Sequence, residues 1–402
     1  MSLVVDQPTV PQTAKESEDF SLVLGGPLYQ LLLRSGLIRP PLGNLGGRIA
    51  VITAIAWVPL LILTALGGRL ASGVKVPFLY DFEVHSKLLF ALPLLVLAEM
   101  LVYIRMRAIT AQFVERQIVT EKLLPAFHDV ISSAMRLRNS LIVEIGLLLV
   151  VFATALTWQS ALSLSSDTWY ATLSSSSSRS YTPAGRWYAF VSVPVFRFIL
   201  LRWYFRIFIW CRFLFQVSRL DLNLVALHPD RCGGLGFLGN VTFAFAPVLM
   251  AHSGLVAGYI ANHILYEGAT LPRYRMELVG TAAFLLLLVL GPLVVFVPKL
   301  NRARLAGLRT YGRLASDYVV GFAAKWTHED SPAGEPLLGS SDIQSMADLS
   351  NSFAIVQEMK QLPFGKETAI RFLIIIALPL SPLVFTMFSA EEVLKRLISV
   401  VL

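Results

Sequence analysis

Seven long apolar stretches constrain what this chain can fold into. A helix needs about 20 predominantly apolar residues to cross the roughly 30 Å of hydrocarbon in a bilayer. Such stretches lie at residues 49–66, 88–104, 141–158, 189–213, 241–265, 278–298 and 370–388. Each must be helical, because an exposed strand edge would leave backbone groups without hydrogen bonds in lipid. The sequence therefore predicts an all-α, polytopic membrane protein with about seven transmembrane helices.

The composition excludes a water-soluble fold. Hydrophobic residues make up 55% of the 402-residue chain and charged residues only 15%, whereas soluble domains carry about 25% charged residues. So few charges cannot cover so much apolar surface. The two cysteines, Cys211 and Cys232, do not provide a disulfide framework. A cytosolic enzyme, a secreted disulfide-rich protein and a disordered chain are therefore all excluded.

The distribution of basic residues predicts the orientation in the membrane. Lysine and arginine collect on the cytoplasmic side of membrane proteins. With the N-terminus in the cytoplasm, 22 of the 34 basic residues fall on that side and 9 on the other. We therefore predict a cytoplasmic N-terminus. We attribute the net charge of +8 to contact with an anionic lipid bilayer and not to nucleic acid, because no basic run with interleaved aromatic residues lies outside a predicted span.

The chain begins with two segments that precede the first span. Residues 1–19 are polar and lack a basic start followed by an apolar run, so they predict a disordered tail and not a cleaved signal peptide. Residues 20–48 predict an interfacial segment, with an amphipathic helix at 27–38 lying on the membrane surface. Residues 49–298 then form a six-helix transmembrane domain.

Residues 299–369 predict a cytoplasmic helical hairpin. Apolar residues recur at helical spacing over 299–329 and 343–361, and a loop containing proline and glycine separates the two runs. We expect a protein partner, or a second copy of the chain, to bind this hairpin through residues 299–361.

Residues 370–402 predict a seventh membrane segment followed by a C-terminal helix. Pro379 and Pro382 leave two alternatives, a single crossing and a re-entrant hairpin, of which we favour the crossing. Ser389 is expected to cap a separate short helix over residues 390–402.

Several ionisable side chains lie within the predicted spans, where an arginine costs at least about 2.5–3.5 kcal/mol and must be paired or hydrated. The set comprises Glu99, Glu144, Arg197, Arg202, Arg206 and His252. Arg202 and Arg206 lie at depths similar to the two glutamates and are expected to pair with them. One interpretation is an ion-pair network that orients the helices, with Arg197 extending outward. The other is a positive lining for an anion pathway. For His252 we favour a packing role over a proton relay.

The loop at 220–239 contains an unusual group of polar and small residues, His228, Asp230, Cys232, Gly233 and Gly234. An extended backbone would point the first three side chains the same way, as a zinc site requires. No second ligand cluster completes such a site, so we predict no metal. In the structural interpretation, which we favour, Pro229 ends the incoming helix, Asp230 caps a turn, and the glycines allow tight packing.

Two strings in the sequence carry a resemblance. HPDRCGGLGFLG at 228–239 and SMADLSNSFAIVQEMKQLPFGKE at 345–367 resemble strings that recur in a family of uncharacterised bacterial multi-pass membrane proteins. The resemblance implies the bacterial inner membrane as the location, and it assigns no activity.

These features lead to three functional hypotheses. The first is a channel or transporter-like protein whose path is lined or braced by the intramembrane arginines, glutamates and His252, with the 228–239 loop at its cytoplasmic mouth. The second is a sensor or assembly scaffold that binds a partner through its cytoplasmic helices. The third is a membrane-embedded enzyme that uses His228, Asp230 and Cys232. No nucleotide fingerprint and no Ser-His-Asp set is present in the sequence, so we expect no cofactor.

Overall fold

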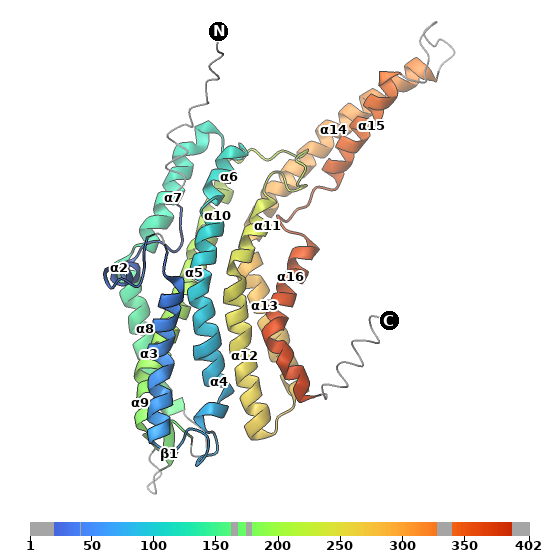
Figure 1. Ribbon diagram of the computed structural model, residues 1–402. Helices are drawn as coiled ribbons and strands as arrows, with labels where there is room; N and C mark the ends of the chain where they lie inside the picture. Colours follow the sequence, from blue (N-terminus) through green and yellow to red (C-terminus); the bar gives the residue numbers. More distant parts are fainter. Residues whose placement is uncertain (1–19, 41, 162–167, 174–178, 328–339, 388–402) are drawn as a thin grey trace, which may run out of the picture.

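The computed structural model describes residues 20–40, 42–161, 168–173, 179–327 and 340–387 (Figure 1). It is 77% helical, and the one sheet among these residues has two strands, so the predicted all-α fold is confirmed. The tail at 1–19 and the capped helix at 390–402 lie outside the described ranges.

The helices and strands have the following bounds. The α-helices are α2 (Pro27–Arg34), α3 (Leu45–Leu66), α4 (Phe82–His85), α5 (Leu92–Met106), α6 (Ile109–Glu115), α7 (Leu124–Arg138), α8 (Leu141–Ala161), α9 (Pro183–Trp187), α10 (Val193–Arg219), α11 (Phe237–Val241), α12 (Ala246–Glu267), α13 (Arg275–Leu290), α14 (Val297–Trp326), α15 (Ser341–Gln357) and α16 (Lys366–Ala377). The tighter or wider helical turns are η2 (Phe78–Tyr80), η3 (Ser86–Ala91), η4 (Glu121–Leu123), η5 (Tyr188–Ser192), η6 (Thr242–Phe245), η7 (Leu271–Tyr274), η8 (Gly291–Phe296) and η9 (Leu378–Thr386). Strand β1 (Ala171–Leu173) pairs antiparallel with β2 (Arg179–Tyr181), with Thr172 opposite Ser180.

Several helical stretches are long and apolar enough to cross a membrane. In the described part of the chain five qualify, namely Leu45–Leu66, Phe82–Glu115, Phe237–Glu267, Leu271–Trp326 and Lys366–Thr386. A sixth is obtained if Glu121–Arg138 and Leu141–Thr154, which meet at 42°, are counted as one span. Arginines interrupt the apolar run of α10, so this helix does not qualify by composition. The structure therefore supports a multi-pass membrane protein with five or six candidate spans.

Helix α3 illustrates how these spans relate to lipid. It is apolar on all sides, as expected for a helix between protein and hydrocarbon. Ala56 and Leu60 are buried against the rest of the bundle, whereas Ile55 and Ile62 are exposed on the opposite side. In water this outer face would be unfavourable, but a bilayer solvates it.

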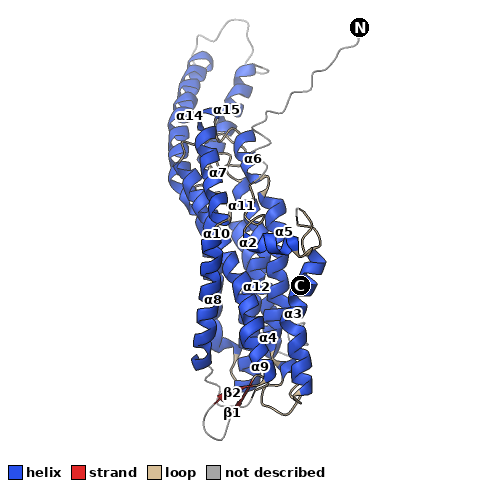
Figure 2. Cartoon of the chain, turned by 90° about the vertical axis from the view of Figure 1, so that its left-hand side faces the viewer, coloured by secondary structure: helices blue, strands red, loops and turns tan. Residues whose placement is uncertain are grey.

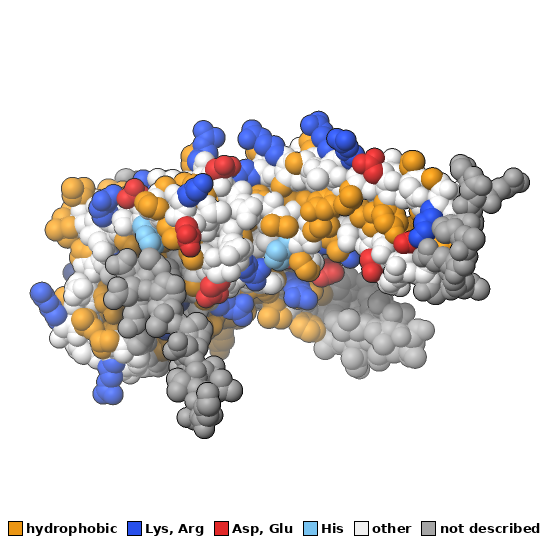
Figure 3. All heavy atoms as spheres, turned by 90° about the horizontal axis from the view of Figure 1, so that it is seen from above, with side chains coloured by type: hydrophobic (Ala, Val, Ile, Leu, Met, Phe, Trp, Pro, Cys, Tyr) orange, Lys and Arg blue, Asp and Glu red, His pale blue; other side chains and the backbone are white. Residues whose placement is uncertain are grey.

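Further helices and one strand lie at the two ends of the bundle. Figure 1 places α6, α7 and the paired helices α14 and α15 at one end, and α9 and strand β1 at the other. Helix α14 continues the span formed by α13 and η8, and with α15 it projects away from the body of the molecule (Figures 1 and 2). In the view along the bundle, basic side chains line one edge of this hairpin beside hydrophobic ones (Figure 3).

The C-terminal part of the apolar face of α15 packs against α14. Phe353 lies beside Gly312, and Val356, next to Gly307, is fully buried. Near the tip of the hairpin the carboxylate of Asp342 accepts hydrogen bonds from Lys325 Nζ at 2.8 Å and Trp326 Nε1 at 3.0 Å. The apolar side chains near the end of α15 are therefore used within the hairpin, whereas Ile343 of α15 and Leu314 and Val320 of α14 remain exposed.

The structure differs from the expected course of the chain at the 220–239 loop. Helix α10 ends at Arg219 and not at Pro229, so that expectation was wrong. The backbone becomes extended at Leu220, whose carbonyl accepts a hydrogen bond from the ammonium of Lys299. The amide of Asn223 then donates to the carbonyl of Ile118 at 2.9 Å. These two contacts stabilise the loop after α10 and replace the helical hydrogen bonds that would have continued it.

The last described segment forms a single helical stretch. Residues Lys366–Thr386 comprise α16 and the 3₁₀ turns of η9, and they form one candidate span. Pro379 and Pro382 lie within η9, where 3₁₀ turns accommodate them, so the chain does not reverse there up to Thr386.

Candidate functional site

Five charged side chains from four helices form one buried cluster, which we call the Arg/Glu cluster. It comprises Arg48 of α3, Glu99 of α5, Glu144 of α8, and Arg202 and Arg206 of α10. The two arginines of α10 are four residues apart, so they lie one turn apart on the same face of the helix. Three guanidinium groups and two carboxylates thus meet where α3, α5, α8 and α10 pack together.

Glu99 is the centre of this cluster. Its Oε1 lies 2.8 Å from Arg206 Nη2 and 3.9 Å from Arg202 Nη1, and its Oε2 lies 3.3 Å from Arg48 Nη1. Glu144 Oε1 is 3.5 Å from Arg202 Nη2. The structure therefore brings together the two glutamates and the two arginines whose similar depth was noted in the sequence. The five side chains expose between 0% and 12% of their surface, so the cluster is shielded from solvent.

Arg48 was missed as a site residue and had been counted among the cytoplasmic charges. Its side chain is 0% exposed, and none of its three guanidinium nitrogens has a hydrogen-bond partner in the described protein. Its ion-pair contact is the 3.3 Å approach to Glu99, a carboxylate that is shared with two other arginines. The sequence shows that Arg48 directly precedes the apolar stretch at 49–66, which places it near the end of a span but does not show which way it faces.

The N-terminal segment covers one side of the cluster. Phe20, which was expected at the membrane surface, is buried, and its ring lies 4.5 Å from that of Phe213. The amide of Leu28, at the start of α2, donates to Glu144 Oε2 at 2.9 Å. Gly26 has a positive φ of 87°, and a Cβ at this position would lie 2.9 Å from Glu144 Oε1. The chain can therefore approach the carboxylate closely only because residue 26 is glycine.

Arg197 and His252 lie apart from the cluster. The half-buried Arg197 donates to Thr154 Oγ1 at 3.2 Å and contacts neither glutamate. His252 Nδ1 lies 2.7 Å from the carbonyl of Val248, and its Nε2 lies 2.6 Å from the hydroxyl of Tyr204. Because a carbonyl only accepts, Nδ1 carries the proton of the neutral ring, and Nε2 accepts from Tyr204. His252 thereby links α12 to α10.

In the 228–239 loop, Asp230 organises the backbone. Its Oδ1 accepts from the amides of Cys232 at 2.7 Å and Gly234 at 3.1 Å, and its Oδ2 accepts from Gly236 at 2.8 Å. Nδ1 of His228 lies 2.9 Å from Oδ1. The backbone is folded in turns here, so the extended arrangement considered for zinc is not found. Burial acts to raise the pKa of Asp230, but the three backbone hydrogen bonds outweigh it and hold this pKa below its ordinary value.

Cys232 does not have the surroundings of a reactive thiol. Its Sγ donates to the carbonyl of Leu362 at 3.6 Å. Burial, together with the nearby carboxylate of Asp230, raises the pKa of this thiol to about 11, so the nucleophilic thiolate is scarce at neutral pH. Among the described residues, no three His, Cys, Asp or Glu side chains form a group that could hold a metal ion.

The two strings that carry the family resemblance pack against each other. The amide of Lys360 donates to the carbonyl of Arg231 at 2.7 Å, and the side chain of Arg231 forms an exposed ion pair with Glu358. A Cβ on Gly239 would lie 2.7 Å from the carbonyl oxygen of Pro363. We call this contact the loop junction. It joins the 228–239 loop to the segment that connects α15 with α16.

We expect Asp230→Asn to lower the free energy of unfolding by about 1–3 kcal/mol at pH 7, because one charged acceptor of backbone amides is lost. The pKa of Asp230 is lower in the folded protein, so its contribution is complete above the ordinary aspartate value of about 3.9. It is lost as the pH falls through the folded pKa. Thermal unfolding in detergent should therefore show a difference between wild type and variant that shrinks below about pH 4.

The matched control for this experiment is Asp221→Asn, which removes an exposed carboxylate from the same loop. It should leave the unfolding temperature almost unchanged at every pH. Equal stability of Asp230→Asn and wild type at pH 7 would show that the three amide contacts do not stabilise the loop.

Comparisons of the chain with protein-family models, with curated proteins and with solved structures found no match.

Proposed function

We propose that this protein is a channel or transporter for a small anion, and that the Arg/Glu cluster is the anion-binding site of its closed state. One observation supports this proposal above all others. The guanidinium of Arg48 is fully buried, and none of its nitrogens is hydrogen-bonded to the described protein. A charge that is buried without adequate partners costs several kcal/mol, so an arginine in this position is a functional candidate by default.

The charges of the cluster point to an anion as the ligand. Three arginines share two glutamates, and Glu99 alone is divided among all three guanidinium groups. A monovalent anion beside Arg48 would balance the remaining positive charge and accept the hydrogen bonds that Arg48 can donate. The low local dielectric strengthens this attraction relative to water.

Opening of the path would require movement of the segment at 20–28. Phe20 and Leu22 of this segment are buried, and the backbone amide of Leu28 donates a hydrogen bond to Glu144 Oε2. With the segment in place the cluster is shielded from solvent, and the hollows of about 430 and 810 Å³ beside α12 do not include any of its five residues. We therefore assign the described arrangement to the closed state.

Our proposal also covers the crossing of α10 and the orientation of the protein in the membrane. We place α10 across the membrane as a further span, because its buried arginines are paired with glutamates of α5 and α8. We propose the bacterial inner membrane, with the N-terminus in the cytoplasm. The excess of basic residues supports this side, as does the location of α7 and the α14–α15 hairpin at one common end of the bundle (Figure 1).

Arg48→Leu provides a sharp test. It leaves two arginines with two glutamates, so the cluster becomes neutral and the protein should still fold. We expect liposomes that contain the purified wild-type protein to release chloride, nitrate or phosphate faster than protein-free liposomes do. Arg48→Leu should reduce that flux by about ten-fold or more, because the positive charge that attracts the anion is gone.

Arg197→Leu is the control, since it removes an arginine of α10 that lies outside the cluster and contacts neither glutamate. Its flux should equal that of wild type. The proposal is wrong if wild type releases none of the three anions above background, or if Arg48→Leu conducts as well as wild type.

The other two hypotheses receive less support from the geometry. A scaffold that binds through an apolar stripe on α15 would have only part of that stripe available, since Val356 is buried beside α14 whereas Ile343 is exposed. An enzyme that uses Cys232 would need a further polar group at the thiol, whose hydrogen bond goes to a backbone carbonyl.

A further inference from the structure

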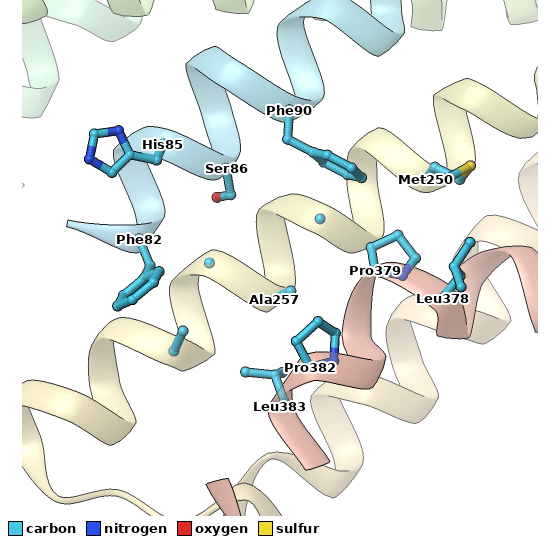
Figure 4. Close-up of a pocket in the computed structure, with 13 residues that line it drawn as sticks. Phe82, His85, Ser86, Phe90, Met250, Ala257, Leu378, Pro379, Pro382 and Leu383 are labelled. Atoms are coloured by element: carbon cyan, nitrogen blue, oxygen red, sulfur yellow. The ribbon is translucent and has the colours of Figure 1, made fainter. Parts of the chain in front are cut away.

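A hollow of about 430 Å³ opens on the side of the bundle between two helical walls. Phe82, Ser86 and Phe90 of the α4–η3 segment form one wall, and Pro379 and Pro382 of η9 form the other. Figure 4 shows these two sets of side chains facing each other across α12. Small residues of α12 form the floor, including Gly254, Ala257 and Gly258. The lining is almost entirely apolar.

A second hollow of about 810 Å³ continues the first toward the end of the bundle that carries α14 and α15. It lies between α5 and α16, and Met250 of α12 lines both hollows. Together they form a groove along α12 from Ala246 to Ala261, a distance of about 22 Å at 1.5 Å per residue. This length exceeds the roughly 15 Å of hydrocarbon in one leaflet.

The second hollow has a polar end. Arg105, near the end of α5, and Arg371 of α16 both line it, and both side chains are exposed. Neither guanidinium has an ion-pair or hydrogen-bond partner among the residues that the structure describes. Asn240, close to the start of α12, adds an amide to the same lining. Two unpaired positive charges and one amide are thus located at one end of an apolar groove.

We propose that this groove is a specific binding site for an anionic phospholipid. The lipid phosphate binds between Arg105 and Arg371, and one acyl chain lies along α12 past Met250 and Ala257. The guanidinium group favours phosphate because its planar donors fit two phosphate oxygens at once. Basic pockets between helices on the cytoplasmic side of a membrane commonly bind such headgroups.

The position of the groove argues for lipid as the occupant. It opens sideways beside Lys366–Thr386 and Phe237–Glu267, two of the candidate spans, so hydrocarbon chains surround it in a membrane. The charges lie at one end and the apolar lining along the rest, as in a phospholipid. A water-soluble anion would use the two arginines but would leave the apolar length empty.

The test uses the full-length protein, purified in mild detergent and titrated with phosphatidylglycerol or phosphatidylcholine under native mass spectrometry. We expect wild type to retain phosphatidylglycerol preferentially. Arg105→Gln/Arg371→Gln should weaken that preference by about ten-fold or more, because both charges that bind the phosphate are removed. Ala257→Phe should weaken retention of both lipids, because the ring fills the apolar part of the groove.

Arg107→Gln/Arg302→Gln is the matched control, since it removes two exposed arginines from the same end of the molecule but outside the groove. It should retain the lipid preference of wild type, and inorganic phosphate should not displace the lipid. The proposal fails if the two double variants behave alike, or if inorganic phosphate competes fully. A doubled mass in place of lipid adducts would mean that a second copy of the chain occupies the groove.

Discussion

Glu99→Gln is expected to lower the free energy of unfolding by about 3–5 kcal/mol, the largest effect of any substitution in the Arg/Glu cluster. The carboxylate of Glu99 contacts Arg48, Arg202 and Arg206, and its loss leaves three buried guanidinium groups with Glu144 alone. The side chain of glutamine has nearly the same shape, so packing changes little. The measurement is unfolding in mixed detergent, followed by circular dichroism.

Two further variants make this prediction specific. Glu277→Gln removes an exposed carboxylate from α13 and should change stability by less than about 0.5 kcal/mol. Arg48→Leu/Glu99→Gln should be more stable than Glu99→Gln alone, because one uncompensated cation is removed with the anion. A Glu99→Gln protein as stable as wild type would show that the cluster is hydrated and not a dry ion-pair network.

Gly258→Leu is expected to destabilise the bundle by about 3 kcal/mol or more, the largest packing effect that we predict. A Cβ at residue 258 would lie 2.0 Å from Ser86 Oγ and 2.7 Å from the backbone carbonyl oxygen of Phe82. The hydroxyl could rotate away, but the carbonyl belongs to the helical backbone of α4. Helices α12 and α4 would therefore have to move apart, which would expose apolar surface at their contact.

Gly280→Leu in α13 is the matched control, because no atom lies within 4 Å of the Cβ position there. Thermal unfolding in detergent should show a large loss for Gly258→Leu and almost none for Gly280→Leu. Similar unfolding temperatures for both variants would contradict the close contact between α12 and α4.

Much of the fold could be predicted from local patterns. Long apolar stretches identify helices in lipid because the backbone must satisfy its own hydrogen bonds there. The relation between Arg202 and Arg206 was also predictable, since two residues four apart share a helix face. Their pairing with Glu99 and Glu144 followed from depth, because each residue advances a helix by about 1.5 Å.

Other features were not predictable from local patterns. Arg48 lies at the start of α3, and nothing in its neighbouring residues shows whether that turn faces water or the bundle. The end of α10 at Arg219 depends on Lys299 and Ile118, which are distant in sequence. The strings at 228–239 and 345–367 were separate in the sequence analysis, yet they meet at the loop junction.

The amino-acid sequence by itself determined that this protein is helical and belongs in a membrane, because hydropathy and helical period are properties of single segments. Only the tertiary structure decided which arginines lack partners and where a groove remains between helices. Charge compensation and cavities depend on the distances between segments, and those distances arise only when the helices pack.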